Sequence, residues 1–165
     1  MKGEATEPTG LVPDANVLID YVQSDVDILG LIAKHVATVH VPGPILDEVT
    51  QLSAKLLIRL GLNLLEPSLS QVAVASQHHR AISFQDRLCL IVARDGGWHC
   101  LTNDKALRNQ CKRVGVPCVW GLEVMRWLVR DRQLPARRAL SVAASIRIVN
   151  PYITQEILDR FRGQI

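Results

Sequence analysis

Four acidic residues in separate segments of the chain have the type and setting to do chemistry together. Each follows a predicted strand or lies near the start of a predicted helix: they are Asp14, Glu48, Asp86 and Asp104. In an open parallel sheet, ligands bind where the carboxyl ends of the strands meet. Crowded carboxylates repel one another unless protons or cations neutralise them, so this set predicts a site for Mg²⁺ or Mn²⁺. Such a site suits hydrolysis of a phosphodiester by a metal-activated water.

Each acid also has an ordinary structural interpretation, which the sequence leaves open. Asp14 can cap a helix, and so can Asp104, because carboxylates accept hydrogen bonds from free amides at helix starts. Ser83 and Asp86 have the spacing of a capping box. Glu48 can be a solvated acid near a helix N-terminus.

The elements that must position these acids follow from the apolar pattern. Short apolar runs alternate with longer helical patterns, which indicates strands separated by helices. The predicted strands are residues 11–14, 37–41, 62–66, 98–102 and 117–120. The predicted helices are residues 16–22, 25–36, 44–60, 69–78, 83–95, 105–114, 122–131, 136–146 and 154–161. Every crossover between strands is long enough for a helix, so we expect a mainly parallel sheet with helices on both faces.

The local sequence around the acids resembles a known family. The segments VPDANVLID, ILDEV, SFQDRLCLIVA and LTNDKALR, in this order, look like the motifs of PIN-domain ribonucleases. The most numerous members of that family are the toxins of VapBC toxin-antitoxin pairs. The resemblance covers residues 10–125, and it implies a three-layer α/β/α sandwich with a five-stranded parallel sheet of order 3-2-1-4-5. It also implies that the four acids bind one or two Mg²⁺ or Mn²⁺ ions, and that Asn16 and Thr102 orient Asp14 and Asp104.

By the same resemblance, we expect a metal-dependent endoribonuclease that is the VapC-like toxin of such a pair. The expected partners are an RNA substrate, a cognate antitoxin protein and a second copy of the chain in a homodimer. Apolar segments at residues 52–60 and 122–129 can supply the dimer interface or pack on the sheet instead. Two alternatives stay open: a non-catalytic PIN-fold module that binds RNA or protein, and a PIN nuclease that acts in RNA processing or on branched DNA.

Residues 126–165 are expected to form a helical C-terminal extension packed on the nuclease domain. It is similar to the extension of a subset of toxin-like PIN proteins. Basic side chains of this extension, and one at the start of the predicted helix over residues 105–114, are candidate contacts for RNA phosphates or an acidic antitoxin. They are Lys105, Arg126, Arg130, Arg137 and Arg138. A solvated or ion-paired role for each arginine stays open.

Composition narrows the class of protein. The 165 residues are 48% apolar, which suits one globular domain with an aliphatic core. Residues 1–104 carry a net charge of −5 and residues 105–165 one of +8, so the chain can hold a cation at one part and a polyanion at another. The aromatic content of 4% argues against a stacking platform for single strands. No apolar run is long enough to span a membrane and the N-terminal residues are polar, so we expect a cytoplasmic protein.

The cysteines have no spacing typical of a zinc finger. They are Cys89, Cys100, Cys111 and Cys118. The sequence predicts reduced cysteines that pack as small apolar side chains.

Overall fold

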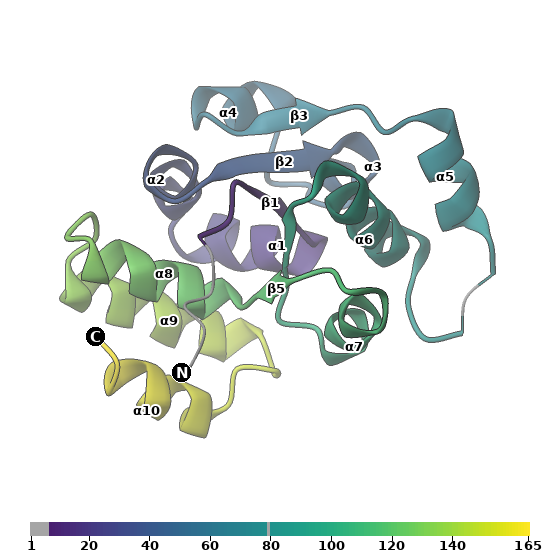
Figure 1. Cartoon of the computed structure of the whole chain (residues 1–165). Helices are drawn as coiled ribbons and strands as arrows, with labels where there is room; N and C mark the ends of the chain where they lie inside the picture. The colour runs from purple at the N-terminus through teal and green to yellow at the C-terminus, as the bar shows by residue number, and fades with distance from the viewer. Residues whose placement is uncertain (1–6, 79) are drawn as a thin grey trace.

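A five-stranded parallel sheet forms the centre of the computed structural model, which describes residues 7–78 and 80–165. The strands are β1 (Gly10–Pro13), β2 (Thr38–Pro42), β3 (Asn63–Leu65), β4 (His99–Leu101) and β5 (Cys118–Val119). Their order is β3-β2-β1-β4-β5 (Figure 1), with Leu11 of β1 in register with Val39 of β2 and His99 of β4. This confirms the predicted α/β class, parallel sheet and strand order.

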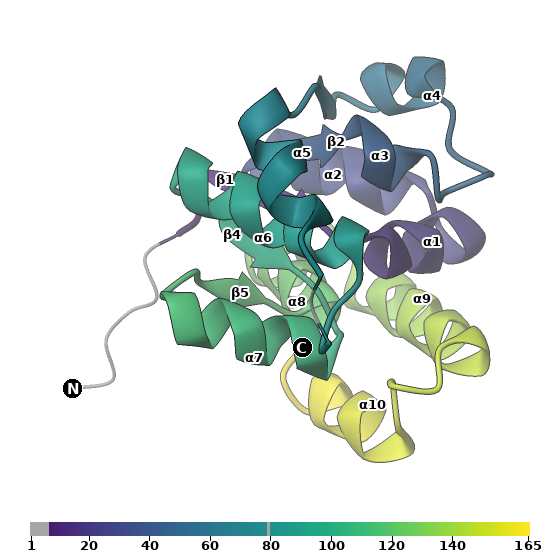
Figure 2. The ribbon, with the colours of Figure 1, turned by 90° about the vertical axis from the view of Figure 1, so that its right-hand side faces the viewer.

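Helices cover both faces of the sheet. In chain order they are α1 (Ala15–Ser24), α2 (Asp27–His35), α3 (Gly43–Leu46), α4 (Ala54–Arg59), α5 (Leu69–Ser76), α6 (Phe84–Gly96), α7 (Lys105–Val114), α8 (Gly121–Arg130), α9 (Ala136–Val149) and α10 (Gln155–Arg162). Helix α6 packs against β1, β2 and β4 and has α5 and α7 as neighbours, whereas α2 packs against β2 and α1. Figure 2 shows α6 and α7 on one side of the molecule and α1 and α9 on the other.

Two glycines end helices where the sequence predicts helix ends. Gly97 follows α6 and Gly115 follows α7, with backbone φ angles of 68° and 73°. A side chain strains this left-handed conformation, so glycine is the residue best suited to it. Each turn sends the chain directly towards the next strand.

The predicted helix over residues 44–60 is wrong as a continuous element. Helix α3 ends at Leu46, and α4 starts only after Ser53, whose hydroxyl accepts a hydrogen bond from the Leu56 amide at 3.1 Å. The helix break is explained by this second cap, together with β-branched residues in the connecting segment. Glu48 therefore lies in a turn after α3 and not within a helix.

The three C-terminal helices pack on the rest of the chain. Helix α8 packs against α2, and α9 packs against α1, α8 and α10 (Figure 1). The apolar face of α8 is fully enclosed, because Val124, Met125 and Leu128 are all 0% exposed. Of the two segments considered for a dimer interface, the one at residues 122–129 thus serves mainly the core.

The sheet ends on very short strands. Strand β3 has 3 residues and β5 has 2, and these two strands form the edges.

Within the described residues, no helix is long and apolar enough to cross a membrane.

Candidate active site at the carboxyl edge of the sheet

Asp14 lies at the carboxyl end of the central strand β1. Its Oδ1 accepts a hydrogen bond of 2.8 Å from the Val17 amide, which caps α1, and its Oδ2 accepts one from the Thr102 hydroxyl. The residue is only 2% exposed. Asp14 is therefore a helix cap, as one interpretation of the sequence predicts. It also lies at the edge where ligands bind in this class of sheet, as the other interpretation requires.

Asp104 follows β4, the neighbour of β1 on the other side of the point where strand order reverses. Its Oδ1 accepts a 2.7 Å hydrogen bond from the Leu107 amide, so it caps α7. Its own backbone amide donates to Thr102 Oγ1 at 3.0 Å. The Thr102 hydroxyl thus bridges the two acids, since it donates to Asp14 and accepts from Asp104. That contact agrees with the positioning role that the resemblance implies for Thr102.

The other two acids come from segments on either side of the sheet edge. Asp86 is in the first turn of α6, half-buried, and its amide donates to the Ser83 hydroxyl at 3.1 Å. Glu48 is exposed in the turn after α3. Helix α3 packs against α6, and this contact brings the two segments together.

The four carboxyl groups influence one another. Burial raises the pKa of Asp14 to about 7, the hydrogen bonds from Thr102 and Val17 oppose that rise, and the charges of Asp86 and Asp104 add to it. Burial is also the first cause of the raised pKa of Asp86, to which Asp104 contributes. The pKa of Glu48 is raised by burial and by Asp86.

No cation among residues 7–78 and 80–165 forms an ion pair with this group. Arginine ion pairs occur elsewhere in the described residues, but none of them involves Asp14, Glu48, Asp86 or Asp104. We call these four residues the acidic edge. Oxygen-only donors that repel one another are the kind of set that suits a hard divalent ion.

The present side-chain positions do not form a coordination cage. Among residues 7–78 and 80–165, no group of three or more His, Cys, Asp or Glu side chains is arranged to hold a metal ion. Both oxygens of Asp14 are already occupied by Val17 and Thr102. The acidic edge fits a divalent cation in donor chemistry and charge, and holding one requires the side chains to move closer together.

Asn16 stands apart from the carboxyl of Asp14. Its side chain is exposed, and it lines a small cavity with Asp20, Asn150 and Tyr152 between α1 and the turn after α9. The orienting role implied for Asn16 stays a prediction.

Most of the predicted basic contacts are engaged within the chain. Arg126 pairs with Glu123, Arg130 with Glu7 and Asp131, and Arg138 with Asp25 and Asp27. Arg137 is exposed and forms no ion pair with a residue that the structure describes. Lys105 is also exposed, at the first position of α7 directly after Asp104.

A buried polar network next to the acidic edge was not predicted. The Asn150 side chain donates to Asp20 Oδ2 at 2.7 Å, and a second hydrogen bond joins Asp20 to Asn103. Asn103 Oδ1 accepts from the Gly121 amide at 3.0 Å. The network links α1, the segment before α7, and the C-terminal helices. The Asn-Pro pair at residue 150 was a visible turn signal, but its partner 130 residues away was not.

A basic pocket between α7 and β5 also escaped the sequence analysis. It encloses about 560 Å³ and is lined by Lys105, Arg108, Asn109, Lys112, Val116, Cys118 and Trp120. The Arg108 guanidinium lies 3.5 Å from the centre of the Trp120 ring. The spacing of residues 105, 108 and 112 places three cations on one helix face, and that signal was available from the sequence.

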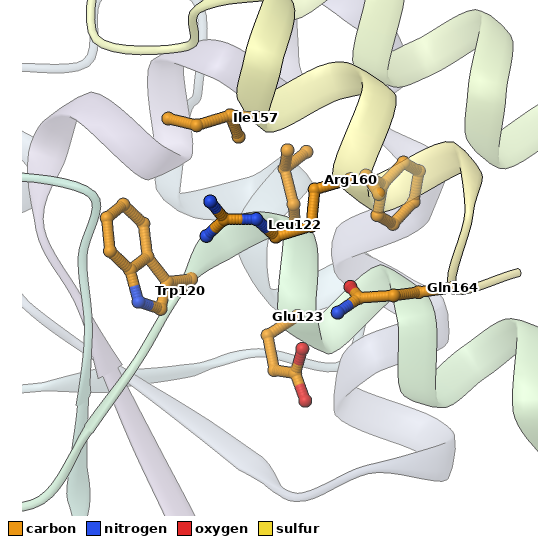
Figure 3. Close-up of a pocket in the computed structure, with 7 residues that line it drawn as sticks. Trp120, Leu122, Glu123, Ile157, Arg160 and Gln164 are labelled. Atoms are coloured by element: carbon orange, nitrogen blue, oxygen red, sulfur yellow. The ribbon is translucent and has the colours of Figure 1, made fainter.

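Trp120 also borders a second, smaller pocket. This cavity of about 210 Å³ lies between α8 and α10, and the Arg160 side chain extends across it towards Trp120 (Figure 3). Leu122, Ile157 and Phe161 supply apolar walls. The indole of Trp120 therefore separates a basic pocket from a largely apolar one.

Comparison with protein families and with curated proteins adds no relative. The chain matches no protein-family model, and no curated protein is significantly similar to it. What supports the likeness to the PIN-domain fold is the sheet itself, five parallel strands in the order 3-2-1-4-5.

Proposed function

We propose that this protein is a divalent-metal-dependent endoribonuclease whose active site is the acidic edge. The observation that carries the proposal is the crowding of Asp14, Asp86 and Asp104, whose charges act on one another without a compensating cation in the described chain. Helix capping accounts for the positions of Asp14 and Asp104 at this edge, where helices begin, but it does not offset the repulsion between these charges and Asp86. Clusters of this kind are tolerated when a bound cation or a proton offsets their repulsion.

The acidic edge would hold Mg²⁺ or Mn²⁺ through Asp14, Asp86 and Asp104, with Glu48 as a further ligand. A bound divalent ion supplies an activated water and offsets charge on a phosphodiester. Thr102 keeps the Asp14 carboxyl turned towards β4, because its hydroxyl is fixed on the other side by the Asp104 amide. The chain itself therefore supplies the alignment of two acids on adjacent strands.

The basic pocket supports a polyanionic substrate. Lys105 directly follows Asp104, and Arg108 and Lys112 continue the same face of α7. Phosphate groups on a strand passing the acidic edge would meet these cations next. We infer that RNA approaches across the N-terminal half of α7.

Within this proposal, the chain acts as the VapC-like toxin of a toxin-antitoxin pair, with a cognate antitoxin and a homodimeric state. The dimer is best supported at residues 52–60, where Ile58 of α4 is 62% exposed; on the neighbouring strand β3, Leu64 is 39% exposed. Light scattering tests this arrangement: Ile58→Glu is expected to give a monomer.

The proposed activity is tested with matched acid substitutions. The Asp86→Asn, Asp104→Asn and Glu48→Gln variants are incubated with structured RNA and Mn²⁺ beside the unmodified protein. The control is Asp47→Asn, which removes an exposed carboxyl next to Glu48. We expect cleavage by the unmodified protein and the control, and its loss in Asp86→Asn and Asp104→Asn. Equal cleavage by all variants would defeat the proposal.

A non-catalytic RNA-binding module is the second candidate. It is favoured by the engagement of both Asp14 oxygens in hydrogen bonds and by the missing coordination cage in the described part of the chain. Calorimetric titration separates the two candidates. Heat of Mn²⁺ binding that disappears in Asp104→Asn supports the nuclease, whereas RNA binding without any Mn²⁺ binding supports the module.

A further inference from the structure

The thiol of Cys118 differs from the other three in its access to solvent. Cys89, Cys100 and Cys111 are buried, whereas Cys118 is half-buried and lines the basic pocket. Cys118 is in register with Cys100 on the adjacent strand, and α7 carries Cys111 against β5. All four cysteines are unpaired thiols, as predicted, and the predicted packing as small apolar side chains holds for the three that are buried.

The neighbours of Cys118 stabilise its thiolate form. The Cys100 and Cys111 thiols beside the Cys118 sulfur favour its negative charge, and Arg108 and His99 do so as well. These contacts lower the pKa of Cys118 to about 4, against the opposing effect of burial. For Cys111 the contacts with Cys100 and Cys118 raise the pKa, and for Cys100 the lowering effect of Cys111 is outweighed by Cys118, Cys89 and burial. Among these three thiols, Cys118 therefore has the strongest tendency to ionise.

The pocket around this sulfur has the charge and the unmet hydrogen bonding of an anion site. Lys105, Arg108 and Lys112 line it, and the seven described lining residues include no acid. Arg108 Nη1 is buried without a hydrogen-bond partner in the described chain. A buried donor left unpaired is destabilising, and a hydrogen bond to a carboxylate ligand would offset that cost. The volume of about 560 Å³ suits a small organic molecule.

We propose that Cys118 is a site of thiol-disulfide exchange with an anionic low-molecular-weight disulfide, of which oxidised glutathione is the probe. The Cys118 thiolate attacks one sulfur of the disulfide. A bond forms between Cys118 Sγ and that sulfur as the original S–S bond breaks, and the departing glutathione thiolate takes a proton from water. Cys118 is oxidised to a mixed disulfide and one glutathione is reduced, so no other oxidant is needed.

The exchange is measured on the whole chain, reduced beforehand, by intact mass and peptide mapping after incubation with oxidised glutathione. We expect one glutathione per chain, located on Cys118, and none in Cys118→Ser. A disulfide from Cys118 to Cys100 or Cys111, seen as the loss of two hydrogens, is the same exchange carried one step further and supports the proposal. Adducts spread evenly over the four cysteines would overturn it. Because mapping of the unmodified protein locates the adduct, the result does not depend on how well the variant folds.

The rate of exchange tests the pocket itself. An ordinary exposed cysteine loses about tenfold in rate for each pH unit below its pKa, whereas Cys118 is expected to react at a nearly level rate from pH 8 to 5.5. Lys112→Gln should slow oxidised glutathione about twofold at low ionic strength and leave a neutral disulfide, bis(2-hydroxyethyl) disulfide, unaffected. Arg113→Gln is the matched control, because Arg113 is exposed on the same helix but does not line the pocket. A steep pH dependence, or equal effects of the two substitutions, would contradict the proposal. All readouts are independent of nuclease activity.

Discussion

Two buried aspartates, one capping α1 and one in its middle, are placed in very different surroundings. Asp14 at the N-terminus of the helix is influenced by the charges of Asp86 and Asp104, whereas Asp20 receives hydrogen bonds from the Asn150 and Asn103 amides. Both are almost inaccessible, at 2% and 5% exposure, and burial raises the pKa of both, to about 7 and about 6. The two residues differ in their neighbours. Asp20 accepts hydrogen bonds from neutral amides, which connect segments of the fold, whereas Asp14 lies near like charges, which favour the binding of a cation.

The largest expected effect is a difference in RNA cleavage between substitutions of Asp14 and of Asp20. Asp14→Asn removes a carboxylate from the acidic edge, so we expect Mn²⁺-dependent RNA cleavage to fall by about a hundredfold or more. Asp20→Asn keeps a similar shape and is expected to change cleavage by less than about threefold. Initial rates on one RNA substrate measure both. Similar losses of cleavage rate in the two variants would contradict the assignment of the acidic edge as the active site.

The second effect is a loss of stability when the hydrogen bond between Asn150 and Asp20 is removed. Asn150→Ala leaves the Asp20 carboxylate without its 2.7 Å donor, and we expect a loss of about 1–3 kcal/mol in the free energy of unfolding at pH 7.5. Urea unfolding measures it. Asp20→Asn combined with Asn150→Ala should lose less than the sum of the single changes, because the two side chains act as a pair. Additive losses would show that the hydrogen bond carries little energy.

The third effect is a pH dependence of stability. The pKa of Asp20 is about 6 in the folded chain, above its ordinary value of 3.8, so the folded state keeps a proton that the unfolded state has released between these values. The contribution of this group to stability is therefore present below about pH 4 and is lost as the pH rises through 6, by roughly 2–3 kcal/mol. Asp20→Asn should flatten this part of the stability curve. An unchanged curve would place the titration elsewhere.

The smallest effect is the response of stability to metal. If an ion neutralises the acidic edge, millimolar Mn²⁺ should stabilise the unmodified protein by about 1–2 kcal/mol at pH 7.5, corresponding to binding well above its Kd. Asp20→Asn should respond equally, and Asp104→Asn should respond little. Thermal unfolding with and without Mn²⁺ gives the comparison, with Ca²⁺ as a second ion to gauge selectivity.

Local sequence signals were sufficient for the parallel sheet and for the positions of Asp14 and Asp104 after their strands, whereas the strand order was anticipated through the family resemblance. The glycines at 97 and 115 end helices in the left-handed conformation, and the segments between strands are long enough for the helical crossovers that parallel pairing needs. The break after Leu46 was missed because the helical apolar pattern continues past it, and the Ser53 cap competes successfully with that pattern. Propensity was overruled there by a specific hydrogen bond.

Contacts between segments that are distant along the chain could not be predicted from the sequence. The pairing of Asp20 with Asn150 joins residues in α1 and after α9, and no local pattern specifies which buried amide meets which carboxyl. The hydroxyl bridge of Thr102 was anticipated only through the family resemblance. The basic pocket lies between these cases, since its helical face could be recognised in the sequence, while its Trp120 and Cys118 walls depend on how β5 sits beside α7.

The brevity of the outer strands restricts how this molecule can associate. A peptide or a second copy that tried to extend the sheet would find main-chain groups of only 3 residues at one border and 2 at the other. Strand addition gains its affinity from a run of such groups. We therefore expect a protein partner to be recognised mainly through side chains and not through the backbone of the edge strands.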